Sequence, residues 1–257
     1  MKKKVIKIKC IILAAGYATR LYPLTKETPK PLLPIAGTPM IEHILSRVAE
    51  VEPIDTIYIV TNNKFFNHFT DWLEHYESKI PIKILNDGTN LEHDRLGAVG
   101  DIHFAITHEK IDEDILIVAG DNLFDFSLHN LYRFYCQKKA SVIALYDVKH
   151  KHIIANKLGA VEVSNEKKII RFEEKPAEPN TTLASTACYV ITKEDVEFLE
   201  KCIVENRRLD NLGDFIKYLA ERKHVYGFVF EEKWFDIGSH EQLLEADQFW
   251  RQKFIDG

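Results

Sequence analysis

Ile11-Ile12-Leu13-Ala14-Ala15-Gly16-Tyr17-Ala18-Thr19-Arg20-Leu21 is the stretch that decides the fold of this chain. An apolar, largely β-prone run over residues 5–13 leads into a turn of small residues, where backbone N–H groups can approach an anion closely. Arg20, and Lys30 within Pro29-Lys30-Pro31, add fixed positive charge. A guanidinium can hold two phosphate oxygens while an ammonium acts as a point charge, which suits a triphosphate. The stretch therefore predicts a strand followed by a phosphate-binding loop.

The sequence pattern beyond this loop indicates the architecture of the fold. Short apolar runs rich in β-branched residues alternate with stretches in which apolar residues recur at helical spacing. The apolar runs, which predict strands, are residues 57–60, 82–85, 115–119 and 142–145. The helical stretches are residues 41–50, 64–78, 98–108 and 127–139. This alternation is typical of an α/β fold with a Rossmann-like, mainly parallel sheet that carries helices on both faces. Ligands of such sheets bind outside the carboxyl ends of the strands.

The pattern changes after about residue 148. Two β-prone segments joined by a polar turn predict an antiparallel hairpin over 158–163 and 169–173. Further strands and helices are expected at 187–191, 193–205, 212–221, 225–230 and from 240 onward. There is no linker rich in Gly or Ser and no internal repeat, so we expect the second half to insert into one sheet and complete it, giving a single domain over 1–257.

Composition excludes several classes of protein. With 46% hydrophobic and 28% charged residues, the chain has an ordinary globular composition, and no apolar run approaches the roughly 20 residues that cross a bilayer. The lysines at 2–4 precede an apolar segment that Lys7 and Lys9 interrupt, so we expect the first strand there and no signal peptide. A net charge of −5 argues against a nucleic-acid partner.

The cysteines and histidines suggest no metal site. The four cysteines stand far apart and form neither a zinc motif nor a disulfide framework, so we expect reduced thiols in a cytoplasmic protein. The 11 histidines are scattered, with His150 and His152 the only close pair, which favours structural or solvated roles.

Two acids follow apolar runs at predicted strand ends. Asp121 comes after residues 115–120, and Asp236 lies within Trp234-Phe235-Asp236-Ile237-Gly238. Taken alone, Asp121 is as consistent with a residue that caps the next helix as with a metal ligand. Together with a triphosphate loop, however, two carboxylates suit Mg²⁺, which takes one or two of them and completes its shell with phosphate oxygens and water. The sequence therefore predicts a Mg²⁺ site at Asp121 and Asp236.

The loop as a whole resembles a known family signature. The string Gly-x-Ala-Thr-Arg-Leu-x-Pro-Leu-Thr over 16–25, followed by Thr-Pro-Lys-Pro-Leu-Leu-Pro over 28–34, resembles that of the sugar-1-phosphate nucleotidyltransferases, of the glucose-1-phosphate thymidylyltransferase and uridylyltransferase kind. The family has glycine at the positions of Ala15 and Ala18. The resemblance extends through the motifs around Asp121, Lys175 and Asp236, and implies that a nucleoside triphosphate and a sugar 1-phosphate condense to a nucleotide sugar and pyrophosphate.

The resemblance also implies roles for individual residues. Arg20 and Lys30 would be catalytic, and Asp121 and Asp236 would hold the metal. The expected nucleotide-binding residues are Leu13, Ala14, Ala15, Gly16, Thr19, Asn86 and Gly97, and the expected sugar-phosphate-binding residues are Gly159, Glu174, Lys175 and Tyr189. Residues 1–148 would form the nucleotide-binding half and 149–257 the sugar-phosphate-binding half. Asn86 would read the base, with a pyrimidine favoured.

Other functions stay open at this point. A choline-phosphate cytidylyltransferase would share the loop, and a catalytically silent regulatory homologue would keep the fold. A glycosyltransferase would carry an Asp-x-Asp motif where this chain has Asp121-Asn122-Leu123. The chain ends soon after its last predicted helix, so we expect a single activity without the acyltransferase domain fused to some family members.

Overall fold

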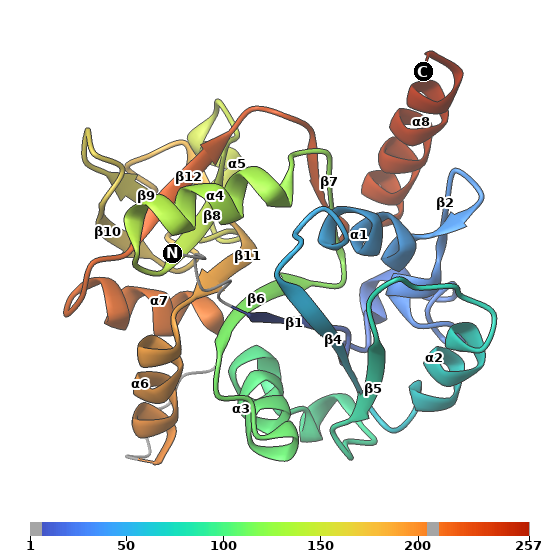
Figure 1. The fold of residues 1–257 in the computed structure, drawn as a ribbon. Coiled ribbons are helices and arrows are strands. Elements are labelled where there is room, and N and C mark those ends of the chain that lie inside the picture. The colour runs from blue at the N-terminus through green and yellow to red at the C-terminus, as the bar shows by residue number, and fades with distance from the viewer. Residues whose placement is uncertain (1–6, 205–210, 257) are drawn as a thin grey trace.

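A nine-stranded mixed sheet runs through the computed structural model, which describes residues 7–204 and 211–256 (Figure 1). Its main path runs in the order β10-β9-β11-β6-β1-β4-β5, while β8 pairs with β11 and β12 with β8. The strands are β1 (Ile8–Leu13), β4 (Ile54–Thr61), β5 (Ile82–Asn86), β6 (Asp114–Ala119), β8 (Val142–Asp147), β9 (Ala160–Val163), β10 (Ile169–Glu173), β11 (Leu183–Ile191) and β12 (Tyr226–Phe230).

Strand direction confirms the predicted α/β class. β1 pairs in parallel with both β4 and β6, and β4 with β5, whereas β11 runs antiparallel to β6, β8 and β9. The predicted hairpin is present as β9 and β10, and strands from both halves of the chain share the sheet. Val5 and Ile6 of the expected first strand, and Glu205 of an expected helix, lie outside the described residues.

Helices cover both faces of the sheet because residues along its central strand alternate between two cores. Ile8, Cys10 and Ile12 of β1 join a core with α1, α2 and α4, whereas Ile11 joins a core with α3, α6 and α7. The helices are α1 (Met40–Val48), α2 (Phe66–Leu73), α3 (Gly97–Glu109), α4 (Leu128–Lys138), α5 (Lys151–Ile154), α6 (Lys193–Val204), α7 (Leu212–Ala220) and α8 (His240–Asp256). All but the short α5 were predicted from the sequence, with ends that differ by a few residues.

Two small antiparallel pairs lie outside the main sheet. β2 (Pro34–Ile35) pairs with β3 (Thr38–Pro39), and β7 (Asn122–Phe124) pairs with β13 (Trp234–Asp236). Sequence periodicity did not reveal these elements, since two or three residues are too few to show an alternation. The second pair decides the site, because Asp236 lies opposite Asn122 and therefore beside Asp121.

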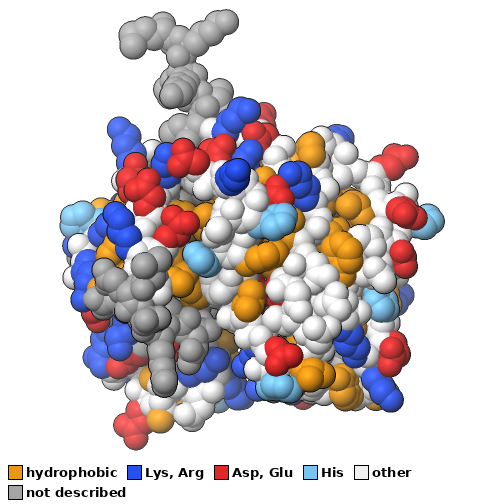
Figure 2. All heavy atoms as spheres, turned by 90° about the horizontal axis from the view of Figure 1, so that it is seen from below, with side chains coloured by type: hydrophobic (Ala, Val, Ile, Leu, Met, Phe, Trp, Pro, Cys, Tyr) orange, Lys and Arg blue, Asp and Glu red, His pale blue; other side chains and the backbone are white. Residues whose placement is uncertain are grey.

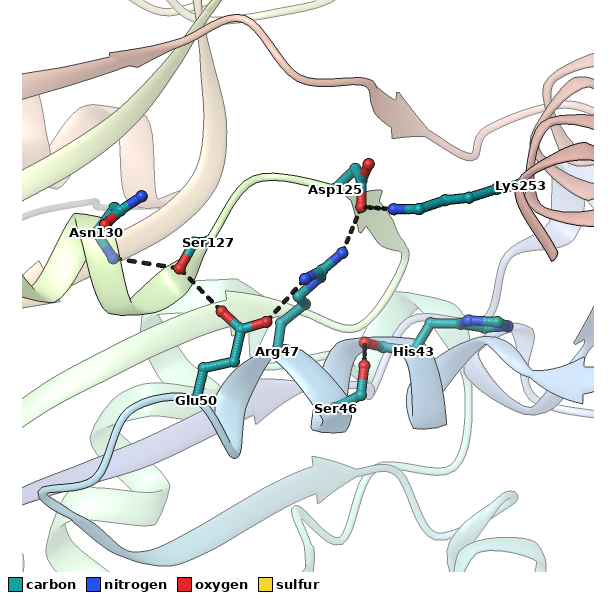
Figure 3. A network of polar contacts seen from close by, with 8 residues as sticks. All are labelled: His43, Ser46, Arg47, Glu50, Asp125, Ser127, Asn130 and Lys253. Carbon is teal, nitrogen blue, oxygen red and sulfur yellow. Dashed lines mark hydrogen bonds and ion pairs between the residues drawn. The ribbon is translucent and has the colours of Figure 1, made fainter. Parts of the chain in front are cut away.

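The last helix, α8, packs against the loops that follow the first strand. A cluster that we call the α8 core holds it there, formed by Leu21, Leu33, Ile35, Met40, Leu123, Ile237, Ala246 and Trp250. Polar contacts add to this attachment: Asp125 accepts hydrogen bonds from Arg47 of α1 and from Lys253 of α8 (Figure 3). Arg47 also donates to Glu50 at 2.7 Å, and Glu50 accepts from Ser127, the N-cap of α4, at 2.9 Å.

The outer surface is ordinary in its charge distribution on the face shown in Figure 2, where acidic and basic side chains are interspersed among small groups of hydrophobic ones. In the described part of the chain, no helix combines the length and the apolar character needed to cross a membrane.

Candidate active site

A cavity of about 480 Å³ opens at the carboxyl ends of β1 and β6. It brings together most of the residues that the sequence singled out, namely Leu13, Ala14, Ala15, Gly16, Lys30, Gly97, Asp121, Gly159, Glu174, Lys175, Tyr189 and Asp236. Thr19, Arg20 and Asn86 are not among the residues that line it. The position agrees with the rule that open α/β sheets bind ligands beyond the carboxyl ends of their strands.

Hydrogen bonds of its backbone hold the loop that follows β1, the predicted phosphate-binding loop. The amide of Ala14 donates to the carbonyl of Val60 at 2.8 Å, and the side-chain amide of Asn62 donates to the carbonyl of Ala15 at 2.9 Å. Gly16 is exposed, and a Cβ placed on it would meet no atom within 4 Å. The small residues thus leave room for an anion beside the loop.

Ala18 adopts a left-handed conformation, with φ 49° and ψ 41°. Its carbonyl accepts a hydrogen bond from the buried Thr25 hydroxyl at 2.7 Å, which helps to hold the turn. A left-handed alanine costs energy that glycine avoids, and glycine is the residue that the resembling family has here. Alanine at this position therefore preserves the turn at some cost in stability.

Lys30 and two aspartates form the polar centre of the cavity. The Lys30 ammonium donates to Asp121 Oδ2 at 2.7 Å and to the carbonyl of Ile237 at 2.6 Å. Burial alone would raise the pKa of Asp121, but the charge and hydrogen bond of Lys30 outweigh it and lower that pKa. Burial and the charge of Asp121 raise the pKa of Asp236 to about 6. The centre is therefore poised to accept additional positive charge.

This donor set fits Mg²⁺. Two half-buried carboxylates line the same cavity, Asp121 from the turn between β6 and β7 and Asp236 from the end of β13. The charge of Asp121 contributes to the raised pKa of Asp236. A divalent cation between them would relieve this charge repulsion, with phosphate oxygens and water completing its shell. No group of three or more His, Cys, Asp or Glu side chains suited to a metal occurs among the described residues, so substrate oxygens would have to contribute.

The opposite wall is built by the β9–β10 hairpin and the start of α7. A Cβ on Gly159 would come within 2.8 Å of Phe172 Cζ, and one on Gly213 within 2.0 Å of Glu174 Oε2. A side chain at position 159 would therefore clash with the ring of Phe172, and one at position 213 would displace the Glu174 carboxylate. Burial raises the pKa of Glu174, and the Lys175 ammonium lies 3.6 Å from its Oε1.

Sequence reasoning missed several residues that line the cavity, including Arg95, Asp101, Asn122, Lys157, Asn211, Gly213 and Trp234. Asn122 donates to Asp121 Oδ1 at 2.9 Å and accepts from Trp234 Nε1 at 2.6 Å, so it fixes the orientation of the Asp121 carboxylate. Its place directly after Asp121 was the available signal. Asp101 gave none, because an isolated acid in a helical segment is usually solvent-exposed.

The predicted residues outside the lining have identifiable positions. Thr19 and Arg20 lie on the short 3₁₀ helix η1 (Thr19–Leu21), where Arg20 is exposed, although its positive charge still favours the ionised form of Asp236. The amide of Asn86 donates to Asn63 Oδ1 at 2.8 Å, and its oxygen accepts from the backbone of Gly88 at 2.9 Å. The side chain of Asn86 thus bonds to its own loop through its oxygen and to the neighbouring loop after β4 through its amide.

Solved structures with the same fold include two of UDP-glucose pyrophosphorylases. UDP-glucose pyrophosphorylase complexed with UDP-glucose superposes with a TM-score of 0.79 at 24% identity, covering 96% of this chain and 99% of that one. UDP-glucose pyrophosphorylase from Acinetobacter baumanii gives a TM-score of 0.77 at 18% identity and covers 98% of both chains. At these identities the likeness shows a shared fold.

Sequence comparison identifies the family. The chain is 29% identical over 239 residues to the bifunctional protein GlmU of Methanocaldococcus jannaschii, which covers 93% of this chain and 53% of that protein. It is 30% identical over 257 residues to glucose-1-phosphate adenylyltransferase of Clostridium novyi, covering 92% and 65%. The chain thus spans about half the length of the first of these relatives. Since the family model for nucleotidyl transferases matches residues 9–253, the chain belongs to the nucleotidyl transferase family.

Proposed function

We propose that this protein condenses a nucleoside triphosphate with a sugar 1-phosphate, giving a nucleotide sugar and pyrophosphate. One observation carries the proposal: Lys30, Asp121 and Asp236 share a single cavity with Glu174 and Lys175. The first group suits a triphosphate with its cation, and the second suits a phosphorylated sugar. The activities named for relatives, such as glucose-1-phosphate adenylyltransferase, belong to the same reaction class.

The reaction needs alignment and charge neutralisation more than acid–base chemistry. A phosphate monoester is mostly dianionic near neutral pH, so its oxygen can attack the α-phosphorus without a general base. We assign Lys175 to the attacking phosphate and Lys30 to the triphosphate, and Glu174 to the sugar hydroxyls. Gly159 and Tyr189 complete the sugar pocket. Arg20 would reach the departing pyrophosphate from outside the cavity lining.

The nucleotide is assigned to the phosphate-loop side of the same cavity. Its phosphates would lie along the loop, with Gly97 at the start of α3 beyond them. The loop residues concerned are Leu13, Ala14, Ala15, Gly16 and Thr19. We accordingly propose that 1–148 form a nucleotide-binding half and 149–257 a sugar-phosphate-binding half of one domain.

Asp121 and Asp236 would hold Mg²⁺. Bound there, the ion would neutralise charge on the phosphates during transfer. Asn122 keeps the Asp121 carboxylate in place through its 2.9 Å hydrogen bond, and Lys30 balances the same carboxylate. Asn122 and Lys30 thus hold the Asp121 carboxylate in position and in its charged form, ready to bind a cation.

The test is pyrophosphate release measured across the common nucleoside triphosphates against hexose 1-phosphates and phosphocholine, with and without Mg²⁺. We expect a single productive sugar 1-phosphate and dependence on Mg²⁺. Asp121→Asn should lower turnover by roughly a hundredfold or more, because the centre loses a charge on which the transferring groups depend. Arg222→Ala, on an exposed arginine outside the cavity lining, is the control.

Two outcomes would contradict the proposal. Productive turnover with phosphocholine and no sugar phosphate would point to a choline-phosphate cytidylyltransferase. A folded protein that gives no pyrophosphate with any combination would point to a catalytically silent homologue.

A further inference from the structure

β13, a strand of only three residues, brings two side chains to the cavity. Trp234 and Asp236 stand two residues apart, so their side chains leave the strand on the same face, and both line the cavity. Phe235, between them, packs instead against the α8 core. Asp236 lies opposite Asn122 of β7, which places Trp234 diagonally across the pair from Asn122, within reach of an aromatic side chain.

Two hydrogen bonds in series connect Trp234 to Asp121. The indole Nε1–H of Trp234 donates to Asn122 Oδ1 at 2.6 Å, and Asn122 Nδ2 donates to Asp121 Oδ1 at 2.9 Å. The other carboxylate oxygen, Asp121 Oδ2, accepts from the Lys30 ammonium at 2.7 Å. Each oxygen of Asp121 thus has a donor, and the donor on Oδ1 depends on how the amide of Asn122 is turned.

The two partners of Asn122 agree on a single orientation of its side-chain amide. An ionised carboxylate can only accept a hydrogen bond, and an indole can only donate one. Turning the amide by 180° would aim its oxygen at the Asp121 carboxylate and its NH₂ group at the indole N–H, so both bonds would become repulsions. Asn122 is only 4% exposed, so without the indole its oxygen would be buried with no donor. Trp234 therefore anchors the amide from the side away from Asp121.

The indole that supplies this anchor is itself held by apolar contacts. The rings of Trp234 and Tyr146 lie with their centroids 5.7 Å apart, and Trp234 packs against a small buried cluster that includes Ile154 and Ala184. A phenylalanine at position 234 would keep an aromatic ring among these contacts but would have no N–H. The donor can thus be removed separately from most of the packing.

We propose that Trp234 is a positioning residue for the metal site, whose indole N–H holds the amide of Asn122 and through it the Asp121 carboxylate that receives the cation. The inference rests on the proposed function and adds to it a residue that acts only through Asn122. β13 would then serve the site twice, directly through the carboxylate of Asp236 and indirectly through Trp234.

The first test needs neither metal nor substrate. The three tryptophans of the chain are Trp72, Trp234 and Trp250, and replacing each by phenylalanine assigns its indole signal in a nitrogen–proton correlation spectrum. We expect Asn122→Ala to move the Trp234 indole proton upfield, because its acceptor is lost. The Trp72 signal should not move, since that N–H donates to Glu42 Oε1 at 2.9 Å, outside the cavity lining. An unmoved Trp234 signal would overturn the inference.

The second test measures the Kd of the protein for Mn²⁺, which takes the same kinds of ligand as Mg²⁺ and is observed directly by electron paramagnetic resonance. Trp234→Phe should raise this Kd roughly threefold to tenfold, the effect of one hydrogen bond. Asn122→Ala should raise it by at least as much, because it removes the direct partner of the Asp121 carboxylate. The double variant should bind no more weakly than Asn122→Ala alone, because Trp234 acts through Asn122.

Trp72→Phe is the matched control for this test. It also removes an indole N–H that donates to a side-chain oxygen, but at a residue outside the cavity lining, so the Kd for Mn²⁺ should not change. Wild-type affinity in Trp234→Phe would overturn the inference. An equal further loss when Trp234→Phe is added to Asn122→Ala would overturn it too, because the effect would then not pass through the amide.

The outcomes separate the inference from the function on which it rests. Affinity for Mn²⁺ that depends on Trp234 through Asn122, in a protein that releases no pyrophosphate with any substrate pair, would support the inference and refute the proposed reaction. Pyrophosphate release together with an affinity indifferent to Trp234→Phe would do the reverse. If the wild-type protein binds no Mn²⁺, the two carboxylates form no cation site by themselves and the inference fails.

Discussion

At position 16 a methyl group would point into open space, whereas at position 120 it would lie 2.8 Å from the carbonyl of Leu13. We therefore expect Gly16→Ala to keep its free energy of unfolding within about 0.5 kcal/mol of wild type, yet to raise the KM for nucleotide roughly tenfold, because the methyl takes space needed by phosphate. Gly120→Ala, the matched control, should lose roughly 1–3 kcal/mol. Urea unfolding and initial rates would measure both. Unchanged KM in Gly16→Ala would show that phosphate does not approach this residue.

The buried carboxyl group of Asp101 makes the free energy of unfolding depend on pH. Burial, together with the charge of Asp87, raises its pKa to about 8 in the folded protein, against about 3.9 in an unfolded chain. Between these values the folded state holds a proton that the unfolded state has released, so this contribution is full below the lower pKa and is lost as pH rises through the upper one. Asp101→Asn should remove this loss and be the more stable protein above about pH 8.

Urea unfolding between about pH 5 and about pH 8 measures the slope, which for one proton reaches at most roughly 1.4 kcal/mol per pH unit. Asp147→Asn serves as the control. Hydrogen bonds from Thr182 and Lys149 lower the pKa of Asp147 to about 2, so its contribution is lost only as pH falls below the unfolded value and is constant across this range. Equal slopes in wild type and Asp101→Asn would mean that Asp101 titrates normally.

Among the elements, α1, α4 and α8 are joined through Arg47, whose guanidinium bonds to Asp125 and Glu50 (Figure 3). Arg47→Met keeps the aliphatic stem but leaves Asp125 with Lys253 and Glu50 with Ser127, so we expect a loss of roughly 1–2 kcal/mol. Arg251→Met breaks only an exposed pair with Asp247 within α8 and should cost less than about 0.5 kcal/mol. Thermal and urea unfolding would distinguish them; equal losses would show that the network adds nothing beyond a surface pair.

The predictability of each element followed its length and burial. Strands such as β1 and β6 were predicted from their apolar runs, and for that reason Asp121 could be assigned to the end of a strand. The β7–β13 pair could not be predicted from the sequence, because each strand has only three residues and forms through pairing with the other. Arg20 and Asn86 were assigned through motif position alone, which fixes a place along the chain but not the direction of a side chain.

For the molecule as a whole, the α8 core packs against the segments that carry Lys30 and Asp236. Trp250 is 6% exposed and shares this core with Leu33, near Lys30, and with Ile237, beside Asp236. Trp250→Ala should cost roughly 3–5 kcal/mol and, at temperatures where the protein stays folded, weaken the activation by Mg²⁺. Leu244→Ala removes a side chain that is 62% exposed on the same helix and should change neither. Normal Mg²⁺ activation in a destabilised Trp250→Ala would show that α8 supports only stability.

The pairing of β7 with β13 has a consequence for biosynthesis. Asp121 emerges from the ribosome together with β6, but its partner carboxylate emerges only after β8 to β12 have been made. A nascent chain could therefore assemble the phosphate loop and the central strands early, while still lacking the second carboxylate proposed to hold the cation. Partly synthesised protein would thus have little means of consuming nucleoside triphosphate, and catalytic competence would arise only after β13 has been made.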